Sequence, residues 1–240
     1  MAPMTAPAAA PKRSRGRGVL RGLSTALIVS GSLLLIDAGA TLLWEEPISS
    51  LYAHYQQNDL AGELDRLDKF RPTPVEAKAL KALPDPTRKL AFAARSLDRR
   101  TDDGDAIGRL KIDRIHLSTV VVEGTEAGDL RKGPGHYPAT PLPGQRGTVA
   151  IAGHRTTYGA PFRNIDKVRP GDQVAITMPY GRFTYRVERT RIVKPTDVWV
   201  TQRVSYDRLI LSACHPLYSA AKRIVVFARL VRSEPRGAAA

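Results

Sequence analysis

Three residues of this chain are of types that can together perform acyl transfer. Cys214, the only cysteine in the 240 residues, follows a strand-like apolar run at 208–213. A deprotonated thiol is a strong nucleophile, and a histidine such as His154 can protonate the leaving group near neutral pH. Arg223 opens the next apolar run, and its guanidinium could stabilise the negative charge that develops on a carbonyl oxygen.

Each of these residues alone is a weak signal. A single cysteine is often a small buried apolar residue, a histidine after a glycine is often a turn residue, and an arginine at a strand end is often solvated. The three residues share one feature, because each lies at or just beyond the end of a strand-like run, where a rigid scaffold can aim it at a ligand. One thiol cannot form an internal disulfide, so Cys214 is either inert or functional.

The elements that must position these residues lie between residues 106 and 232. Short apolar runs with alternating polarity, separated by turn residues, predict seven or eight strands. The runs are residues 107–112, 118–122, 148–152, 173–178, 183–193, 209–213 and 224–230. With short helical pieces expected near 126–130 and 160–165, they predict a mainly β fold, a closed or nearly closed β-barrel. Residues 233–240 are expected to be a disordered tail.

The N-terminal residues have a different composition. Residues 1–21 are rich in Ala, Pro and Gly with five basic side chains, and residues 22–44 are apolar or small apart from Asp37. Because about 20 apolar residues span ~30 Å of hydrocarbon, we expect a cytoplasmic basic tail followed by a single transmembrane helix at 22–44. The positive-inside bias then places the catalytic domain outside the cell, at the cell membrane. A cleaved signal peptide is the alternative.

Residues 45–105 predict an extracytoplasmic stalk or linker that is partly helical. Apolar side chains recur at helical spacing in two stretches separated by prolines. These positions are Ile48, Leu51, Tyr55, Leu60, Leu64 and Leu67 in the first stretch, and Leu90, Ala93, Ala94 and Leu97 in the second. This apolar content is too small for a separate core.

Charge and histidine spacing exclude other classes of function. The net charge is +14, and about +10 remains on residues 45–240 once the N-terminal basic residues and Asp37 are set aside. Since the basic residues are scattered and no binding motif accompanies them, we expect contact with membrane lipid and wall polymer and no nucleic-acid partner. The five histidines show no ligand spacing, so we expect no metal and no cofactor.

The local sequences around the three residues resemble those of sortases, the membrane-anchored cysteine transpeptidases of Gram-positive bacteria. The resemblance rests on residues 150–155 (AIAGHR), residues 211–216 (LSACHP) and Arg223, nine residues beyond Cys214. Residues 133–138 (GPGHYP) and 153–162 (GHRTTYGAPF) are most similar to class E sortases of actinobacteria.

This resemblance implies an eight-stranded sortase barrel that cleaves an LPxTG-like or LAxTG-like sorting signal between Thr and Gly. Cys214 would attack the Thr carbonyl to give a thioacyl enzyme, His154 would transfer protons, and Arg223 would hold the substrate and the oxyanion. An amine of a peptidoglycan precursor would then receive the sorted cell-surface protein. The resemblance also implies that Tyr137 contacts the substrate, since a Tyr at this position accompanies LAxTG preference.

The chain also departs from the family pattern, and alternatives stay open. Many sortases have Thr where this chain has Ala213, so one hydroxyl beside the nucleophile is missing. A pilin-polymerising sortase is one alternative, but its Asp-Pro-aromatic lid motif is incomplete because Thr87 follows Asp85-Pro86. A non-catalytic, membrane-tethered binding module with a sortase-like barrel is another. An L,D-transpeptidase does not fit, because Pro216 stands where that pattern has Arg.

Overall fold

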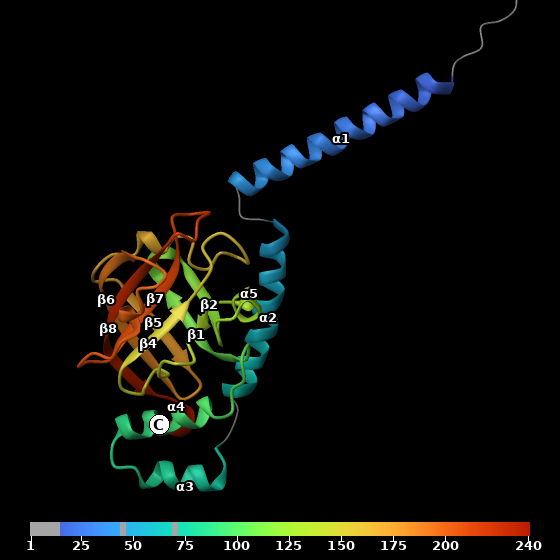
Figure 1. Ribbon diagram of the computed structural model, residues 1–240. Helices are drawn as coiled ribbons and strands as arrows, with labels where there is room; N and C mark the ends of the chain where they lie inside the picture. Colours follow the sequence, from blue (N-terminus) through green and yellow to red (C-terminus); the bar gives the residue numbers. More distant parts are fainter. Residues whose placement is uncertain (1–14, 44–46, 69–71) are drawn as a thin grey trace, which may run out of the picture. The chain divides into compact units, whose positions relative to one another are not determined.

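The computed structural model describes residues 15–43, 47–68 and 72–240, and the chain divides into two units at residues 44 and 45 (Figure 1). The first unit contains helix α1 (Arg15–Leu43). Most of the expected basic tail, residues 1–14, lies outside the described residues.

The transmembrane helix expected at 22–44 is not supported. The residues that the structure describes include no helix with the length and apolar character that crossing a membrane requires.

The second unit is built around a closed barrel, which confirms the mainly β prediction. Its eight strands within the described residues are β1 (Ala106–Ile112), β2 (Leu117–Glu123), β3 (Gly135–His136), β4 (Thr148–Ala152), β5 (Gln173–Met178), β6 (Gly181–Val193), β7 (Arg208–His215) and β8 (Lys222–Pro235). They close in the order β1-β2-β3-β4-β7-β8-β6-β5. The pairs β2–β3 and β4–β7 are parallel, and the other pairs are antiparallel.

Side-chain alternation along the strands fills the interior of the barrel. On β5 and on residues 181–187 of β6 every second residue is buried, which places Ile176, Phe183 and Tyr185 in one apolar core. Each such side chain contributes about 1.5–3 kcal/mol when it is removed from water, so the interior is the main source of stability. Outward-facing residues of the same strands are free to be polar or to build a site.

Short helices connect the strands. They are α5 (Ala127–Lys132) and the 3₁₀ turns η1 (Asp113–Ile115), η2 (Ile165–Lys167), η3 (Val198–Thr201) and η4 (Gly237–Ala239). The helical piece expected near 126–130 is α5, whereas 160–165 forms turns that lead into η2.

Helix α2 (Pro47–Asp68) packs along the outside of β1 and β2, where a stalk was expected. Its Leu60 and Leu64 form a cluster with Val120 and Val122. The amide of Gln57 accepts a hydrogen bond from Val120 N at 2.7 Å and donates one to Val120 O at 3.2 Å. β3 pairs only with Val122 and Glu123, the last two residues of β2, so within the described residues Val120 has no strand partner on that side. The Gln57 amide supplies the hydrogen bonds that such a partner would make.

Helices α3 (Pro74–Ala82) and α4 (Pro86–Asp98) lie at the end of the barrel where β8 finishes (Figure 1). Leu90 and Ala94 of α4 are buried in the barrel core. Asp85 caps α4, because its carboxylate accepts a hydrogen bond from Arg88 N at 2.9 Å. The Asp85-Pro86 pair is therefore a helix start, and it lies away from the end of the barrel at which β7 finishes and β8 begins.

The C-terminal tail is ordered, so the prediction of disorder at 233–240 is wrong. β8 continues to Pro235 and pairs with Gly181 of β6. The following turn η4 contacts α4 and buries Ala239 in the core. The small alanine side chain fits beneath α4, which the composition of the tail did not indicate.

Candidate active site

Strand register brings the three predicted residues to one end of the barrel. In the antiparallel pair β7–β8, Cys214 lies directly opposite Arg223. In the parallel pair β4–β7, Ala152 lies beside Ser212, and the pairing continues when Gly153 N donates to Ser212 O at 3.0 Å. His154 and Cys214, each two residues further along parallel strands, are therefore level with each other.

The loop that carries His154 is fixed by a close approach of an aromatic ring. A Cβ at Gly153 would lie only 2.6 Å from the ring of Phe162, so a glycine is required immediately before His154. Phe162 is fully buried, and its N–H donates to His154 O at 2.9 Å. The loop from 154 to 162 is thereby folded back against the core.

The pKa of His154 is lowered from its ordinary value, mainly because the ring is desolvated and also because the Arg131 cation lies nearby. The imidazole also packs on Tyr158, with ring centroids 5.3 Å apart and planes tilted by 45°. The desolvation of the ring and the charge of Arg131 both disfavour the imidazolium in the free protein. At about pH 7 His154 is therefore neutral and able to accept a proton.

Cys214 and Arg223 share the outer face of the sheet. The alternate residues Leu211 and Ala213 of β7 are packed in the barrel core, so Cys214 points the other way. Arg223 is partly exposed, and its Nη1 donates to Ala220 O at 2.9 Å and to Lys222 O at 3.1 Å. The guanidinium is thus oriented by the backbone of the loop between β7 and β8.

A cluster of apolar side chains lies on the same face of the sheet as Cys214 and Arg223. We call it the outer cluster; its buried members are Ala150, Val200, Ile210, Val225 and Phe227. Trp199 of η3 stacks on Phe227, with centroids 6.0 Å apart and planes within 9°. The face can therefore offer apolar contacts next to the thiol.

Tyr137 packs against the outer cluster, on the same face as Cys214. Its N–H donates to Ala150 O at 2.9 Å, which continues the pairing of β3 with β4 by one residue. The structure therefore brings Tyr137, Cys214 and Arg223 to one face of β3, β7 and β8, and His154 lies two residues beyond the end of β4, the strand that pairs with β7.

Arg155 is a site residue that the sequence reasoning missed. It is 3 % exposed, and its Nη1 lies 3.4 Å from Cys214 O and 3.3 Å from His215 Nδ1. Its Nη2 pairs with Asp166 at 3.1 Å. Because Arg155 directly follows His154, it ties the histidine loop to the strand end that carries the thiol. Its position inside the AIAGHR motif was the available signal.

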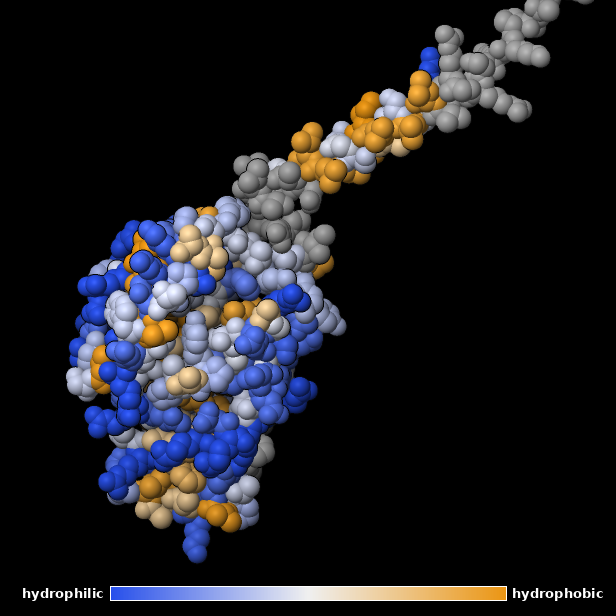
Figure 2. All heavy atoms as spheres, in the orientation of Figure 1, coloured by the Kyte–Doolittle hydropathy of each residue, from blue (hydrophilic) through white to orange (hydrophobic). Residues whose placement is uncertain are grey.

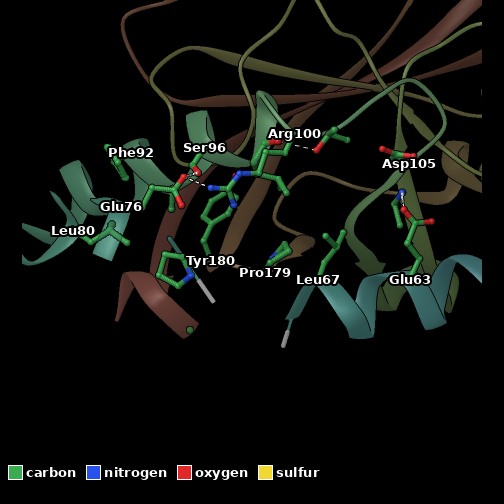
Figure 3. Close-up of a pocket in the computed structure, with 16 residues that line it drawn as sticks. Glu63, Leu67, Glu76, Leu80, Phe92, Ser96, Arg100, Asp105, Pro179 and Tyr180 are labelled. Carbon is green, nitrogen blue, oxygen red and sulfur yellow. Dashed lines mark hydrogen bonds and ion pairs between the residues drawn. The ribbon is translucent and has the colours of Figure 1, made fainter. Parts of the chain in front are cut away.

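A mainly apolar pocket lies away from these residues. It has a volume of about 310 Å³ and lies among α2, α3, α4 and the C-terminal turn (Figure 3). On its wall, Glu76 accepts hydrogen bonds from Ser96 and Arg100. The bond from Ser96 is the main reason that the pKa of Glu76 is lowered to about 2. No residue predicted from the sequence to be catalytic lines this pocket.

Within the described part of the chain, no group of three His, Cys, Asp or Glu side chains is placed to hold a metal ion. A thiol, an imidazole and a guanidinium at one end of a closed barrel instead match the class of cysteine acyl-transfer enzymes. A family model, the Sortase domain, matches residues 110–231, just over half of the chain. The chain belongs to the sortase family and is a sortase cysteine transpeptidase.

Its relatives include sortases of several classes. Sortase D of Bacillus subtilis is 35% identical over 136 residues, which cover 55% of this chain and 67% of Sortase D. Sortase SrtE1 of Streptomyces coelicolor is 26% identical, and the match covers 56% of this chain but 43% of SrtE1. The chain therefore spans less than half of that relative.

A solved structure supports the resemblance to class E. Sortase E from Streptomyces avermitilis is 36% identical with a TM-score of 0.51, covering 56% of this chain and 93% of that one. Sortase E1 from Streptomyces coelicolor, solved with a tripeptide in the active site, is 26% identical with a TM-score of 0.52 and covers 55% and 91%.

Proposed function

We propose that the chain is a sorting-signal transpeptidase in which Cys214 is the nucleophile, His154 carries protons and Arg223 stabilises the oxyanion. The observation that carries the proposal is the strand register, which places the three residues at neighbouring positions. These are the groups that thioester formation and aminolysis require. Family membership supports the assignment, because the sortase match includes all three.

In the first half-reaction, His154 takes the thiol proton, and the thiolate attacks the carbonyl carbon of the Thr that precedes Gly in the signal. The lowered pKa of His154 supports this role, because the free imidazole is neutral. Arg223 stabilises the oxyanion of the tetrahedral intermediate. The C–N bond between Thr and Gly then breaks, the Gly amine leaves with the proton from His154, and a thioester joins Thr to Cys214.

In the second half-reaction, an amine of a peptidoglycan precursor attacks the thioester carbonyl and gives its proton to His154. The C–S bond breaks, an amide forms, and the Cys214 thiolate is released. The partners are cell-surface proteins with a C-terminal signal of LAxTG or LPxTG type.

Recognition of the signal is proposed to occur on the outer cluster. Tyr137 lies against that cluster on the face of Cys214, in reach of an extended peptide that passes the thiol. The tripeptide in the active site of sortase E1 from Streptomyces coelicolor supports a peptide ligand at the corresponding place. We expect Tyr137 to contact the second residue of the signal and to favour Ala over Pro.

The test uses the purified full chain with LAxTG and LPxTG peptides and a glycyl amine acceptor. We expect cleavage between Thr and Gly, joining to the amine, and complete loss of both in Cys214→Ala. Exposed His54 of α2 offers a matched control for His154, so His154→Gln should be inactive and His54→Gln active. A Cys214→Ala protein as active as the parent would contradict the proposal.

The location of the enzyme is a separate part of the proposal. Sortases are enzymes of the cell envelope, and we propose that α1 attaches this one to the membrane with the barrel outside the cell. Exposed apolar side chains along α1 support this idea, whereas hydrophilic side chains cover most of the visible face of the barrel unit (Figure 2). Fractionation after a urea wash tests it; release of the full chain without detergent would contradict it.

A further inference from the structure

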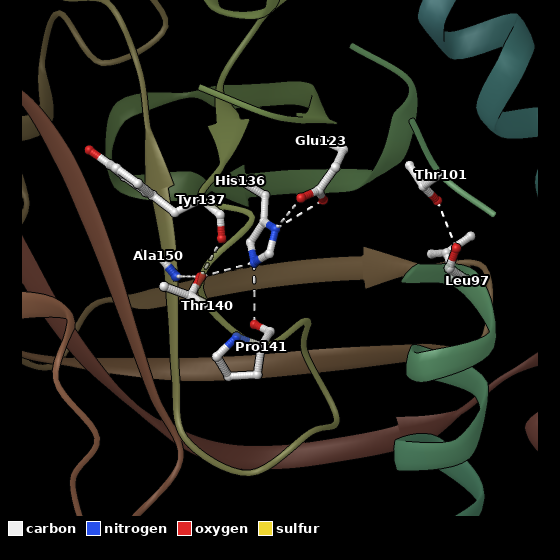
Figure 4. Close-up of polar contacts among 8 residues, drawn as sticks. All are labelled: Leu97, Thr101, Glu123, His136, Tyr137, Thr140, Pro141 and Ala150. Atoms are coloured by element: carbon white, nitrogen blue, oxygen red, sulfur yellow. Dashed lines mark hydrogen bonds and ion pairs between the residues drawn. The ribbon is translucent and has the colours of Figure 1, made fainter. Parts of the chain in front are cut away.

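A buried pair of a carboxylate and an imidazole lies inside the barrel, behind the face that carries Tyr137 (Figure 4). Glu123 of β2 and His136 of β3 are register partners, and His136 Nδ1 lies 2.9 and 3.1 Å from the two carboxylate oxygens. The His136 side chain is 1 % exposed and that of Glu123 is 9 % exposed. Neither residue has a role in the chemistry proposed for Cys214.

The second ring nitrogen of His136 also faces acceptors. Its Nε2 lies 3.1 Å from Thr140 Oγ1 and 3.3 Å from Pro141 O. A backbone carbonyl only accepts, and the Thr140 hydroxyl donates its proton to Tyr137 O at 2.9 Å. Both ring nitrogens of His136 have polar partners, so the ring links the Glu123 carboxylate to the segment that carries Thr140 and Pro141.

Buried polar side chains need hydrogen-bond partners, so the Glu123–His136 contact orders the polar atoms around it. The Thr140 hydroxyl connects the pair to the backbone around Tyr137. It donates to Tyr137 O and accepts from Ala150 N at 3.2 Å, while Thr140 N donates to the same Tyr137 O at 2.9 Å. The chain of contacts thus runs from the His136 ring through Thr140 to the backbone of Tyr137 and of Ala150 in β4.

Tyr137 needs this support because little else fixes its backbone. β3 has only two residues, so Tyr137 lies just beyond the strand, and Pro138 follows it. Its sheet contact is the single bond from its N–H to Ala150 O. Side chains alternate across this short strand, so His136 points into the barrel while Tyr137 packs on the outer cluster.

We propose that His136, Glu123 and Thr140 are positioning residues that fix Tyr137 on the outer face and thereby set the preference for the second residue of the sorting signal. The inference rests on the proposed function. The three residues act through the backbone and touch neither the substrate nor the thiol. Their loss therefore raises KM and weakens the choice between Ala and Pro, while the reactivity of Cys214 is preserved.

The most direct test compares Thr140→Ser with Thr140→Val in the full chain, because serine keeps the hydroxyl and valine keeps the shape. We expect the valine variant to raise KM for the LAxTG peptide at least fivefold, since the hydroxyl loses its contacts with Tyr137 O, Ala150 N and His136 Nε2, with kcat within twofold. Thr140→Ser should match the parent. Glu123→Gln should behave like the valine variant, because an amide NH2 group replaces one of the two carboxylate oxygens that His136 Nδ1 contacts.

Two controls separate this inference from the proposed function. The rate at which a methanethiosulfonate reagent modifies Cys214 should be the same in the parent and in Thr140→Val. A fall in kcat with an equal fall in this rate would show a general structural defect and overturn the inference. A parent that cleaves neither peptide would instead refute the proposed function.

Hydrogen exchange tests the network without any activity. The Ala150 and Thr140 amides should exchange at least fivefold faster in Thr140→Val and in Glu123→Gln than in the parent, and at the parent rate in Thr140→Ser. Equal exchange in all four proteins would overturn the inference, whatever the activity of the parent.

Discussion

At one end of the barrel, Cys214, His154 and Arg223 are partly exposed and are held by strand register and a few backbone hydrogen bonds. At the other end, α4 closes the barrel with buried Leu90 and Ala94. The first end leaves ionisable groups accessible, and the second end buries apolar surface. Substitutions at the first end should therefore lower activity at nearly constant stability. Substitutions at the second end should lower stability at nearly constant activity.

Apart from the inactivation expected for Cys214→Ala and His154→Gln, the largest effect should come from Arg223→Lys. Lysine keeps the positive charge but loses the planar donor geometry and the Nη1 bonds to the loop backbone. We expect kcat/KM to fall about 10²–10³-fold, as for loss of an oxyanion donor, with Tm within about 2 °C of the parent. Lys222→Gln, one residue away, is the matched control and should retain activity. An Arg223→Lys enzyme as active as the parent would contradict the role of Arg223 in stabilising the oxyanion.

Leu90→Ala should show the opposite behaviour at the closed end. The side chain is 2 % exposed and fills the space beneath α4, so its truncation leaves a cavity. We expect a loss of about 2–5 kcal/mol in the free energy of unfolding, measured by urea denaturation. Activity per folded molecule at 20 °C should stay within twofold. A selective loss of kcat in this variant would show that the two ends are coupled.

Glu76→Gln sharpens the comparison through its dependence on pH. The folded pKa of Glu76, about 2, is lower than its usual value near 4.5, so the carboxylate stabilises the fold above about pH 4.5 and this contribution disappears as pH falls toward 2. Allowing for solvent screening, we expect the variant to lose about 1–2 kcal/mol at pH 7. The difference should shrink between pH 4.5 and 2. A difference that is constant over this range would contradict the assignment.

The smallest effect should come from Arg131→Gln beside the site. Removing this cation removes one of the two causes that lower the pKa of His154. We therefore expect the acid limb of the kcat/KM profile to move to higher pH by less than about one unit, with the maximum rate nearly unchanged. A shift to lower pH would mean that another group controls this limb.

The positions of the site residues at strand ends were predictable from the sequence. The packing of α2 against the outside of the barrel was not. The apolar runs before Gly153 and Cys214 predicted two strands whose ends carry His154 and Cys214, and the structure pairs these strands in parallel. The packing of α2 depends on an open edge of β2 that Gln57 fills, and no periodicity within α2 indicates that edge. Arg155 acts through contacts with residues about 60 positions away, so it was also invisible to spacing.

The central claim is that Cys214 becomes acylated. The most direct measurement is intact-protein mass spectrometry of the full chain after incubation with an LAxTG peptide in the absence of an amine, followed by peptide mapping. The account predicts an adduct equal to the peptide up to its Thr, located on Cys214, which disappears when a glycyl amine is added and is absent in Cys214→Ala. Cleavage of the peptide by the Cys214→Ala protein, or an adduct on another residue, would contradict it.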